Sequence, residues 1–316
     1  MLDSLRFVQG AVAKKDYVAT LMHFRIKNKT VCGYNGSIAL NSPIELDLDT
    51  CPLATQFVKA IQTCQDTIQL HMTPAGRLAV KSGKFKAFVD CIQEEFPKIA
   101  PEGKEVQLSG NLLGTLKQLS PFIAEDASRP WARGILLRGQ SAFATNNVIL
   151  VEKWLGAPFP VEVNIPRMAV AELLRIGTEP THLQICENSV TFHFQGNRWL
   201  RTQLSTLAWP DLSPILDKKS NQAIPPKDLW QAIEEIKPFV DEVGRVHLSP
   251  GKIATHIAEG VGAVVELPEV TTNGCFHFEQ LLLLQDVVKT IDLSSYPSPC
   301  LFYGEVIRGA IIGMRL

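Results

Sequence analysis

Apolar residues recur along the chain at two spacings, one typical of helices and one typical of strands. A spacing of three and four residues predicts six helices, and in the second of them Leu53, Phe57 and Ile61 share one apolar face. Two helices directly follow Pro52 and Pro166, because a proline at a helix start loses no hydrogen bond. The predicted helices span residues 2–13, 53–61, 110–123, 167–175, 227–240 and 278–291.

Alternating apolar and polar residues predict strands between these helices. Two strand pairs turn at Asn35-Gly36 and Asn146-Asn147, residue types that tolerate the positive φ angles of a tight hairpin. The predicted strand regions are residues 31–40, 78–89, 142–150, 190–204 and 300–314.

The same order of helix, hairpin, helix and strands occurs three times. The asparagine turns lie about 111 residues apart, and Glu95-Phe96-Pro97 and Ala208-Trp209-Pro210 lie about 113 apart. Segments rich in proline and polar residues, 97–103 and 217–226, are typical of domain boundaries. The sequence therefore predicts three α+β domains, at residues 1–100, 101–217 and 218–316.

Composition excludes several classes of protein. With 46% hydrophobic and 20% charged residues, the chain is typical of a globular protein, not a disordered one. No apolar run approaches the length of a membrane helix and no signal peptide is evident, so we expect a cytoplasmic protein that makes no membrane contact. The seven scattered cysteines form no CxxC motif, which argues against a zinc site or a disulfide framework.

Catalytic chemistry is not indicated either. The sequence contains no P-loop, GxGxxG, GxSxG or HExxH motif, and its seven histidines are scattered. We therefore expect no enzymatic activity, no cofactor and no metal. The formal net charge of −1 means that any surface for nucleic acid must be a local basic stripe.

The whole chain resembles the bacterial β sliding clamp, the processivity subunit of the replicative DNA polymerase, in a form that indicates a phage or mobile-element version. The resemblance is carried by a turn-and-strand motif, the second-domain helix, a Trp-Pro-Asp turn and the C-terminus. These are residues 144–150, residues 163–175, Trp209-Pro210-Asp211 and Met314-Arg315-Leu316. The chain departs from the usual pattern at Asn147-Val148-Ile149, where clamps have Gly, a polar residue and Arg, and at Gly313, where they have proline.

The resemblance implies a ring of two chains joined head to tail, first domain to third, with sheets outside and helices lining a central hole. Such a ring encircles double-stranded DNA and tethers the polymerase, and basic residues contact phosphates without reading bases. The implied DNA-contacting residues are Lys14, Lys15, Lys59, Lys117, Arg129, Trp131, Arg167, Arg175, Lys227 and Lys289. For each basic residue, the alternative interpretation is an ordinary surface charge without a role in DNA binding. For Trp131, the alternative is packing within the core or a loop.

The resemblance also implies a hydrophobic cleft for short linear peptides of DNA polymerase and clamp-loader subunits. In this chain the cleft would use Thr145, Val148, Ile149, Leu150, Ile215, Leu216, Ile312 and Met314. The alternative interpretation is that these residues only seal the junction between two domains. For the dimer interface we expect Ala87 and Phe88 of one copy to meet Phe239 and Val240 of the other.

Two other functions stay open. One is an enzyme, which a turnover assay would reveal. The other is a clamp-fold interaction module that captures replication proteins without encircling DNA, a reading that the near-neutral charge favours. Three domains per chain predict a solution mass of twice that of the chain.

Overall fold

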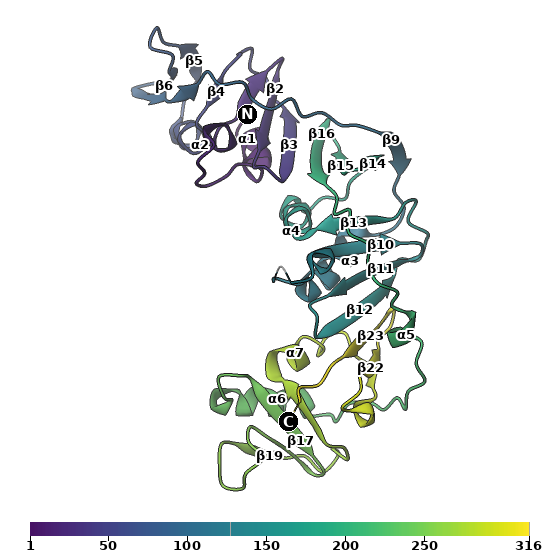
Figure 1. Ribbon diagram of the computed structural model, residues 1–316. Coiled ribbons are helices and arrows are strands. Elements are labelled where there is room, and N and C mark those ends of the chain that lie inside the picture. Colours follow the sequence, from purple (N-terminus) through teal and green to yellow (C-terminus); the bar gives the residue numbers. More distant parts are fainter. Residues whose placement is uncertain (127, 316) are drawn as a thin grey trace. The chain divides into compact units, whose positions relative to one another are not determined.

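The computed structural model describes residues 1–126 and 128–315, so Ala127 and the C-terminal Leu316 lie outside the described residues. The chain divides into two compact units. Unit 1 comprises Met1–Leu113 and Ile165–Thr206, and unit 2 comprises Gly114–Asn164 and Leu207–Leu316. Helices and strands alternate along both units (Figure 1). In the part of the chain that is described, no helix is long and apolar enough to cross a membrane.

Unit 1 contains three complete α-helices and one 3-10 helix. It also contains the predicted strand regions 31–40, 78–89 and 190–204. Its elements are α1 (Leu2–Gln9), η1 (Ala19–Met22), β1 (Arg25–Lys27), β2 (Thr30–Tyr34), β3 (Ile38–Pro43), β4 (Cys51–Pro52), α2 (Ala54–Thr63), β5 (Gln69–Met72), β6 (Leu78–Ser82), β7 (Phe85–Val89), β8 (Cys91–Ile92), β9 (Lys104–Gln107), α4 (Arg167–Ile176), β14 (His182–Cys186), β15 (Ser189–Phe194) and β16 (Arg198–Gln203).

An antiparallel sheet in the order β1-β2-β3-β16-β15-β14-β9 joins segments that are far apart in sequence. Strand β16 pairs with β3, and Leu200 lies opposite Leu40. Helix α1 packs on β2 and β3 and buries Leu5 and Val8. A Cβ atom at Gly33 of β2 would lie 3.0 Å from the Val8 carbonyl oxygen, so a side chain here would require α1 to shift by a few tenths of an ångström.

A second, three-stranded sheet of unit 1 has the order β5-β6-β7. Its core residues are Leu78 and Val80 of β6, which are fully buried together with Phe57 of α2. Strand β7 is an edge of this sheet, and the side chains of Ala87 and Phe88 line an open groove between β7 and α2. An edge strand keeps backbone groups available for pairing with another chain.

Unit 2 contains two further sheets. Its elements are η2 (Ser120–Phe122), η3 (Pro130–Ala132), β10 (Gly134–Arg138), β11 (Ser141–Thr145), β12 (Ile149–Trp154), α5 (Ser213–Leu216), α6 (Leu229–Ile236), η4 (Lys237–Phe239), β17 (Arg245–Ser249), β18 (Lys252–Ala254), β19 (Val264–Glu266), β20 (Gly274–His277), α7 (Phe278–Leu282), β21 (Thr290–Ile291), η5 (Leu293–Ser295), β22 (Cys300–Tyr303) and β23 (Ile307–Ile311). Helix α3 (Leu112–Leu119) and strand β13 (Val163–Pro166) cross the boundary between the units.

The larger sheet of unit 2 has the order β13-β10-β11-β12-β23-β22-β21. Strand β12 pairs with β23 near the C-terminus, and Ile149 lies opposite Ile311. This pairing brings the β11–β12 turn beside Ile312, whose N–H donates to the Val148 carbonyl at 2.9 Å. The smaller sheet has the order β19-β18-β17-β20.

The asparagine turns have the same hydrogen bonds at both predicted positions. Asn35 Oδ1 accepts the N–H groups two and three residues on at 3.1 and 3.0 Å, and Asn146 Oδ1 does the same at 3.1 and 2.8 Å. Positive φ is confined to the second residue of each pair, 91° at Gly36 and 74° at Asn147. The first residue therefore holds the turn through its side chain, and the second supplies the left-handed backbone.

Helices α3 and α6 end earlier than predicted, and for the same reason. Each stops before a proline, at Pro121 and Pro238, and continues as a short 3-10 helix, η2 and η4. A proline has no N–H group to continue the helical bonding, so the last turn tightens instead.

The predicted helix over residues 278–291 is wrong beyond Leu282. Turns follow α7, and Lys289 N–H then donates to the Tyr303 carbonyl at 2.8 Å. Thr290 and Ile291 form β21 and pair with β22. Long-range strand pairing overrides the local helical pattern of this segment, a tertiary effect that outweighs modest intrinsic propensity.

Candidate functional site

A small apolar cleft of about 170 Å³ lies in unit 2. Three segments build it: the β11–β12 turn, the connection that leads into α5, and the end of β23. It is lined by Arg129, Trp131, Thr145, Asn147, Val148, Leu150, Pro210, Asp211, Leu212, Ile215, Pro299, Ala310 and Ile312.

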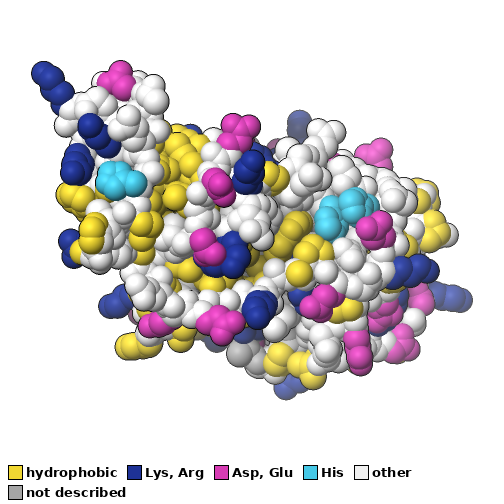
Figure 2. All heavy atoms as spheres, turned by 90° about the horizontal axis from the view of Figure 1, so that it is seen from above, with side chains coloured by type: hydrophobic (Ala, Val, Ile, Leu, Met, Phe, Trp, Pro, Cys, Tyr) yellow, Lys and Arg dark blue, Asp and Glu magenta, His cyan; other side chains and the backbone are white. Residues whose placement is uncertain are grey.

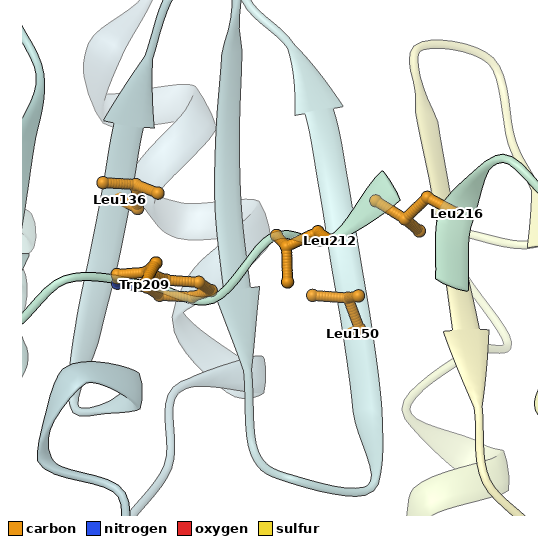
Figure 3. Close-up of a cluster of buried hydrophobic side chains, with 5 residues drawn as sticks. All are labelled: Leu136, Leu150, Trp209, Leu212 and Leu216. Atoms are coloured by element: carbon orange, nitrogen blue, oxygen red, sulfur yellow. The ribbon is translucent and has the colours of Figure 1, made fainter. Parts of the chain in front are cut away.

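The floor of the cleft rests on a buried hydrophobic cluster, shown in Figure 3. Leu136 comes from β10 and Leu150 from β12, while Trp209 and Leu212 lie on the connection that crosses these strands. The Trp131 ring packs edge-on against Trp209, with the ring centroids 4.9 Å apart. This packing stabilises the floor, because aromatic pairs in this geometry gain energy beyond their buried area.

The rim of the cleft carries one charge of each sign, Arg129 and Asp211. The backbone N–H and the hydroxyl of Ser213 hold the pKa of the Asp211 carboxyl below its usual range, so the group is ionised at neutral pH. Inside the rim, the Thr145 hydroxyl donates to the Ile149 carbonyl at 2.8 Å. An apolar floor with a few polar groups at its edge suits an apolar anchor side chain of a ligand.

Of the eight residues predicted for the cleft, five line it: Thr145, Val148, Leu150, Ile215 and Ile312. The other three, Ile149, Leu216 and Met314, do not. Ile149 is fully buried, because successive residues of β12 point to opposite faces of the sheet. Leu216 belongs to the cluster beneath, and the backbone of Met314 bonds to Cys275 and Tyr296.

Arg129 and Trp131 were predicted to contact DNA, yet both line the cleft. Pro210, Asp211 and Leu212 were not predicted as site residues, although the Trp209-Pro210-Asp211 turn was recognised as a motif. The packing of Trp131 on Trp209 places these residues at the cleft. The sequence contains both tryptophans but does not show that they meet.

Five of the predicted basic residues are exposed in the loop after α1 or on helices. Lys59, Lys117 and Arg167 lie on exposed positions of α2, α3 and α4, and Lys14 and Lys15 are exposed in the loop after α1. Lys59 borders the groove between α2 and β7.

Arg175 is engaged by the protein itself. Its guanidinium group donates to the Glu172 carboxylate, and also to the carbonyls of Arg6 and Phe7 at 3.4 and 2.7 Å. The Glu172 side chain is buried, and a Cβ atom at Gly10 would collide with its carboxylate. Arg175 thus fixes α4 to the C-terminal end of α1, where carbonyl groups lack helical partners.

Two lysines predicted on helices lie elsewhere. Lys227 precedes α6, and its N–H group donates to Glu269 at 3.1 Å. Lys289 follows the turns after α7, and its ammonium group lies 3.8 Å from the Glu305 carboxylate. Their helical placement was wrong because both helices are shorter than the apolar pattern indicated, whereas their predicted contact with DNA remains a prediction.

Both sets of residues predicted for the dimer interface, on β7 and at the end of η4, are accessible to solvent. Phe88 is half-exposed on edge strand β7, with the Lys86 ammonium group 4.9 Å from its ring centroid, and Ala87 is half-buried beside it. Phe239 ends η4 with a largely exposed ring, and Val240 follows it.

Charges of both signs are interspersed on the face shown in Figure 2, where no large patch has one sign. This agrees with the near-balance of 31 basic and 32 acidic residues. Among residues 1–126 and 128–315, no group of three or more His, Cys, Asp and Glu side chains is placed to hold a metal ion.

These features define the class of fold: the chain has the fold of bacterial DNA polymerase sliding clamps. Each match covers all of this chain and 97% of the other chain. The predicted α+β clamp fold is confirmed.

The beta sliding clamp of C. crescentus matches with a TM-score of 0.83 and 16% identity, and the DNA polymerase sliding clamp of Bacillus subtilis with 0.81 and 18%. The Helicobacter pylori beta clamp bound to a DNA ligase peptide matches with 0.79 and 17%. No family model and no curated protein matches the chain.

Proposed function

We propose that this protein is a DNA sliding clamp, a non-enzymatic ring that encircles duplex DNA and tethers the replicative polymerase in the cytoplasm. The full-length match to clamp structures carries the proposal, since it covers both units of this chain and 97% of the other chain. The apolar cleft adds support, because a clamp of this fold has been solved with a DNA ligase peptide bound. Peptides of polymerase and clamp-loader subunits are the proposed ligands of the cleft.

The proposed ring consists of two chains, each with three domains at residues 1–100, 101–217 and 218–316. Closure requires a head-to-tail contact, in which the β7 edge with Ala87 and Phe88 meets Phe239 and Val240 of the second copy. Covering Phe88 and Phe239, both of which have exposed rings, supplies an apolar centre for this interface. We expect Phe88→Asp to halve the mass measured by analytical ultracentrifugation, whereas Lys29→Asp, on a surface turn, leaves the mass unchanged.

Sliding requires attraction to phosphates without base contacts. In the proposal, Lys59, Lys117 and Arg167 supply this attraction from exposed helical positions. The test is retention on DNA. Protein loaded onto nicked circular DNA by a bacterial clamp loader should stay bound through gel filtration and leave when the circle is cut. Equal loss from circular and linear DNA would refute encirclement.

Two triple variants with the same change in net charge distinguish the contribution of the basic helical residues to retention from the effect of overall charge. Replacing Lys59, Lys117 and Arg167 by alanine should shorten retention and weaken its salt dependence, because about three phosphate interactions are lost. Replacing Lys29, Lys218 and Lys252, which are exposed outside the helices, removes the same charge and should leave retention unchanged.

The second candidate function is capture of replication proteins without encirclement. The net charge of −1 and the engagement of Arg175 by Glu172 favour it, since both leave less positive charge for DNA. It predicts peptide binding at the cleft together with a mass that does not double and no retention on circles.

A further inference from the structure

Three loops of the chain are built on the same turn. In each, an aspartate side chain accepts the backbone N–H of the residue two positions later: Asp16 at 2.9 Å, Asp126 at 2.9 Å and Asp241 at 3.1 Å. The three loops follow α1, η2 and η4, at the same point of the predicted repeat. This turn leaves its middle residue at the apex of the loop.

The apex residues differ in chemistry. Tyr17 stands at the first apex with a relative exposure of 107%, so its whole side chain lies in solvent. Glu242 stands at the third apex and is also exposed. The first loop also carries Lys14 and Lys15, both exposed. In the described part of the chain, no ion pair involves either lysine and no hydrogen bond or ring contact involves the Tyr17 side chain.

The base of the first loop is fixed. Ala13 N–H donates to the Leu21 carbonyl at 2.8 Å, and Leu21 N–H donates to the Val18 carbonyl at 3.1 Å. Asp16, the acidic residue of the loop, is occupied by the N–H of Val18. An aromatic ring on an anchored turn loses little conformational freedom when it binds a ligand, because its backbone is already ordered.

The chemistry of the loop selects its ligand. A ring that projects from the surface offers both faces for stacking, whereas an apolar peptide side chain needs a concave pocket such as the cleft of unit 2. Two lysines beside an aromatic ring match a base flanked by phosphates. Duplex DNA hides its base faces, so only an unpaired base can stack on the ring.

We propose that Tyr17, Lys14 and Lys15 form a binding site for single-stranded DNA, in which the tyrosine ring stacks on an unpaired base and the lysines bind the adjacent phosphates. The site goes beyond tethering, since encirclement of a duplex needs no unpaired base. It would act where a single strand meets a duplex, and it does not depend on ring closure.

The test uses the full chain and an oligothymidine 12-mer with 2-aminopurine at its centre. Stacking on an aromatic ring quenches 2-aminopurine, so wild type should quench its fluorescence on binding. Tyr17→Ala should weaken binding by about 5- to 160-fold and abolish the quenching, because stacking on an aromatic side chain contributes about 1–3 kcal/mol per base. Tyr17→Phe should keep both the affinity and the quenching. Tyr17 makes no packing contact that its removal would lose, so the variant should fold.

The lysines and the control are tested in the same assay. Replacing both Lys14 and Lys15 by alanine should reduce the slope of log affinity against log salt by about 1.4 and leave the quenching at saturation unchanged. Glu242→Ala alters the matching apex of the third loop and should change affinity less than twofold in either direction.

The inference is overturned if wild type does not bind the 12-mer at low salt, if bound 2-aminopurine is not quenched, or if Tyr17→Ala binds as tightly as wild type. Its failure is distinct from failure of the proposed clamp function. Tyr17→Ala should be retained on circular DNA like wild type. If the wild-type protein quenches 2-aminopurine but does not stay on circular DNA, encirclement alone is refuted.

Discussion

Ile312 offers a direct measure of ligand binding at the cleft. Its side chain lines the cleft and is 47% exposed, while its backbone N–H is held by Val148. Full burial of an isoleucine side chain yields about 1.5–3 kcal/mol, so covering the exposed 47% yields about 0.7–1.4 kcal/mol. Ile312→Ala should therefore raise the dissociation constant of a cleft ligand about 3- to 10-fold.

The assay is fluorescence anisotropy with two labelled peptides. One is the DNA ligase peptide of the kind bound by the Helicobacter pylori clamp, and the other is a short peptide with a Leu-Phe pair as its apolar anchor. Thermal unfolding should show little change in stability for Ile312→Ala, because the residue is half outside the core. Ile224→Ala is the control, since Ile224 is 81% exposed and does not line the cleft.

The reasoning is refuted if Ile312→Ala binds both peptides within twofold of wild type while its unfolding temperature is unchanged. Equal weakening by Ile224→Ala would also count against it, because an effect at a remote isoleucine cannot come from the cleft.

Three further predictions concern stability. Asn146→Ala removes the acceptor of two backbone N–H groups and should lower the free energy of unfolding by about 1–2 kcal/mol in urea titrations; an unchanged midpoint would contradict the role of its side chain. Gly10→Ala places a Cβ atom 1.9 Å from Glu172 Oε1 and should cost about 1–3 kcal/mol, a loss that Glu172→Ala in the same chain should partly relieve. Burial and the neighbouring His182 hold the pKa of His193 below its usual 6.5, so the unfolded chain binds more protons and stability should fall as pH drops below about 6.5. Unfolding of His193→Gln between pH 7.5 and 5.5 should show a smaller fall, and an equal fall would contradict this cause.

Local sequence was sufficient for the features that depend on neighbouring residues. Asn35 and Asn146 identified their turns because an asparagine side chain satisfies the N–H groups two and three residues on. Pro166 marked the start of α4 because its fixed φ and missing N–H suit that position. The repetition of these signals predicted a repeated arrangement of helices and strands, and the resemblance to bacterial clamps implied the α+β clamp fold, which the structural comparisons confirm.

The cleft was only partly predictable, because its walls come from segments that local pattern does not connect. Val148 and Ile312 were recognised by resemblance, but the approach of Trp131 to Trp209 depends on where the connection to α5 crosses the sheet. The alternation of β12 then decides that Leu150 faces the cleft and Ile149 faces the core.

The sequence by itself determined the turns, the helix starts, the apolar faces and their repetition, since these arise from hydrogen bonds and periodicities within a few residues. Tertiary structure alone decided that Thr290 and Ile291 pair as a strand instead of extending α7. It also decided that Arg175 bonds to Glu172 and α1. The strand pairing and the bonds of Arg175 to the Arg6 and Phe7 carbonyls depend on partners more than 10 residues away, whose position no local pattern specifies.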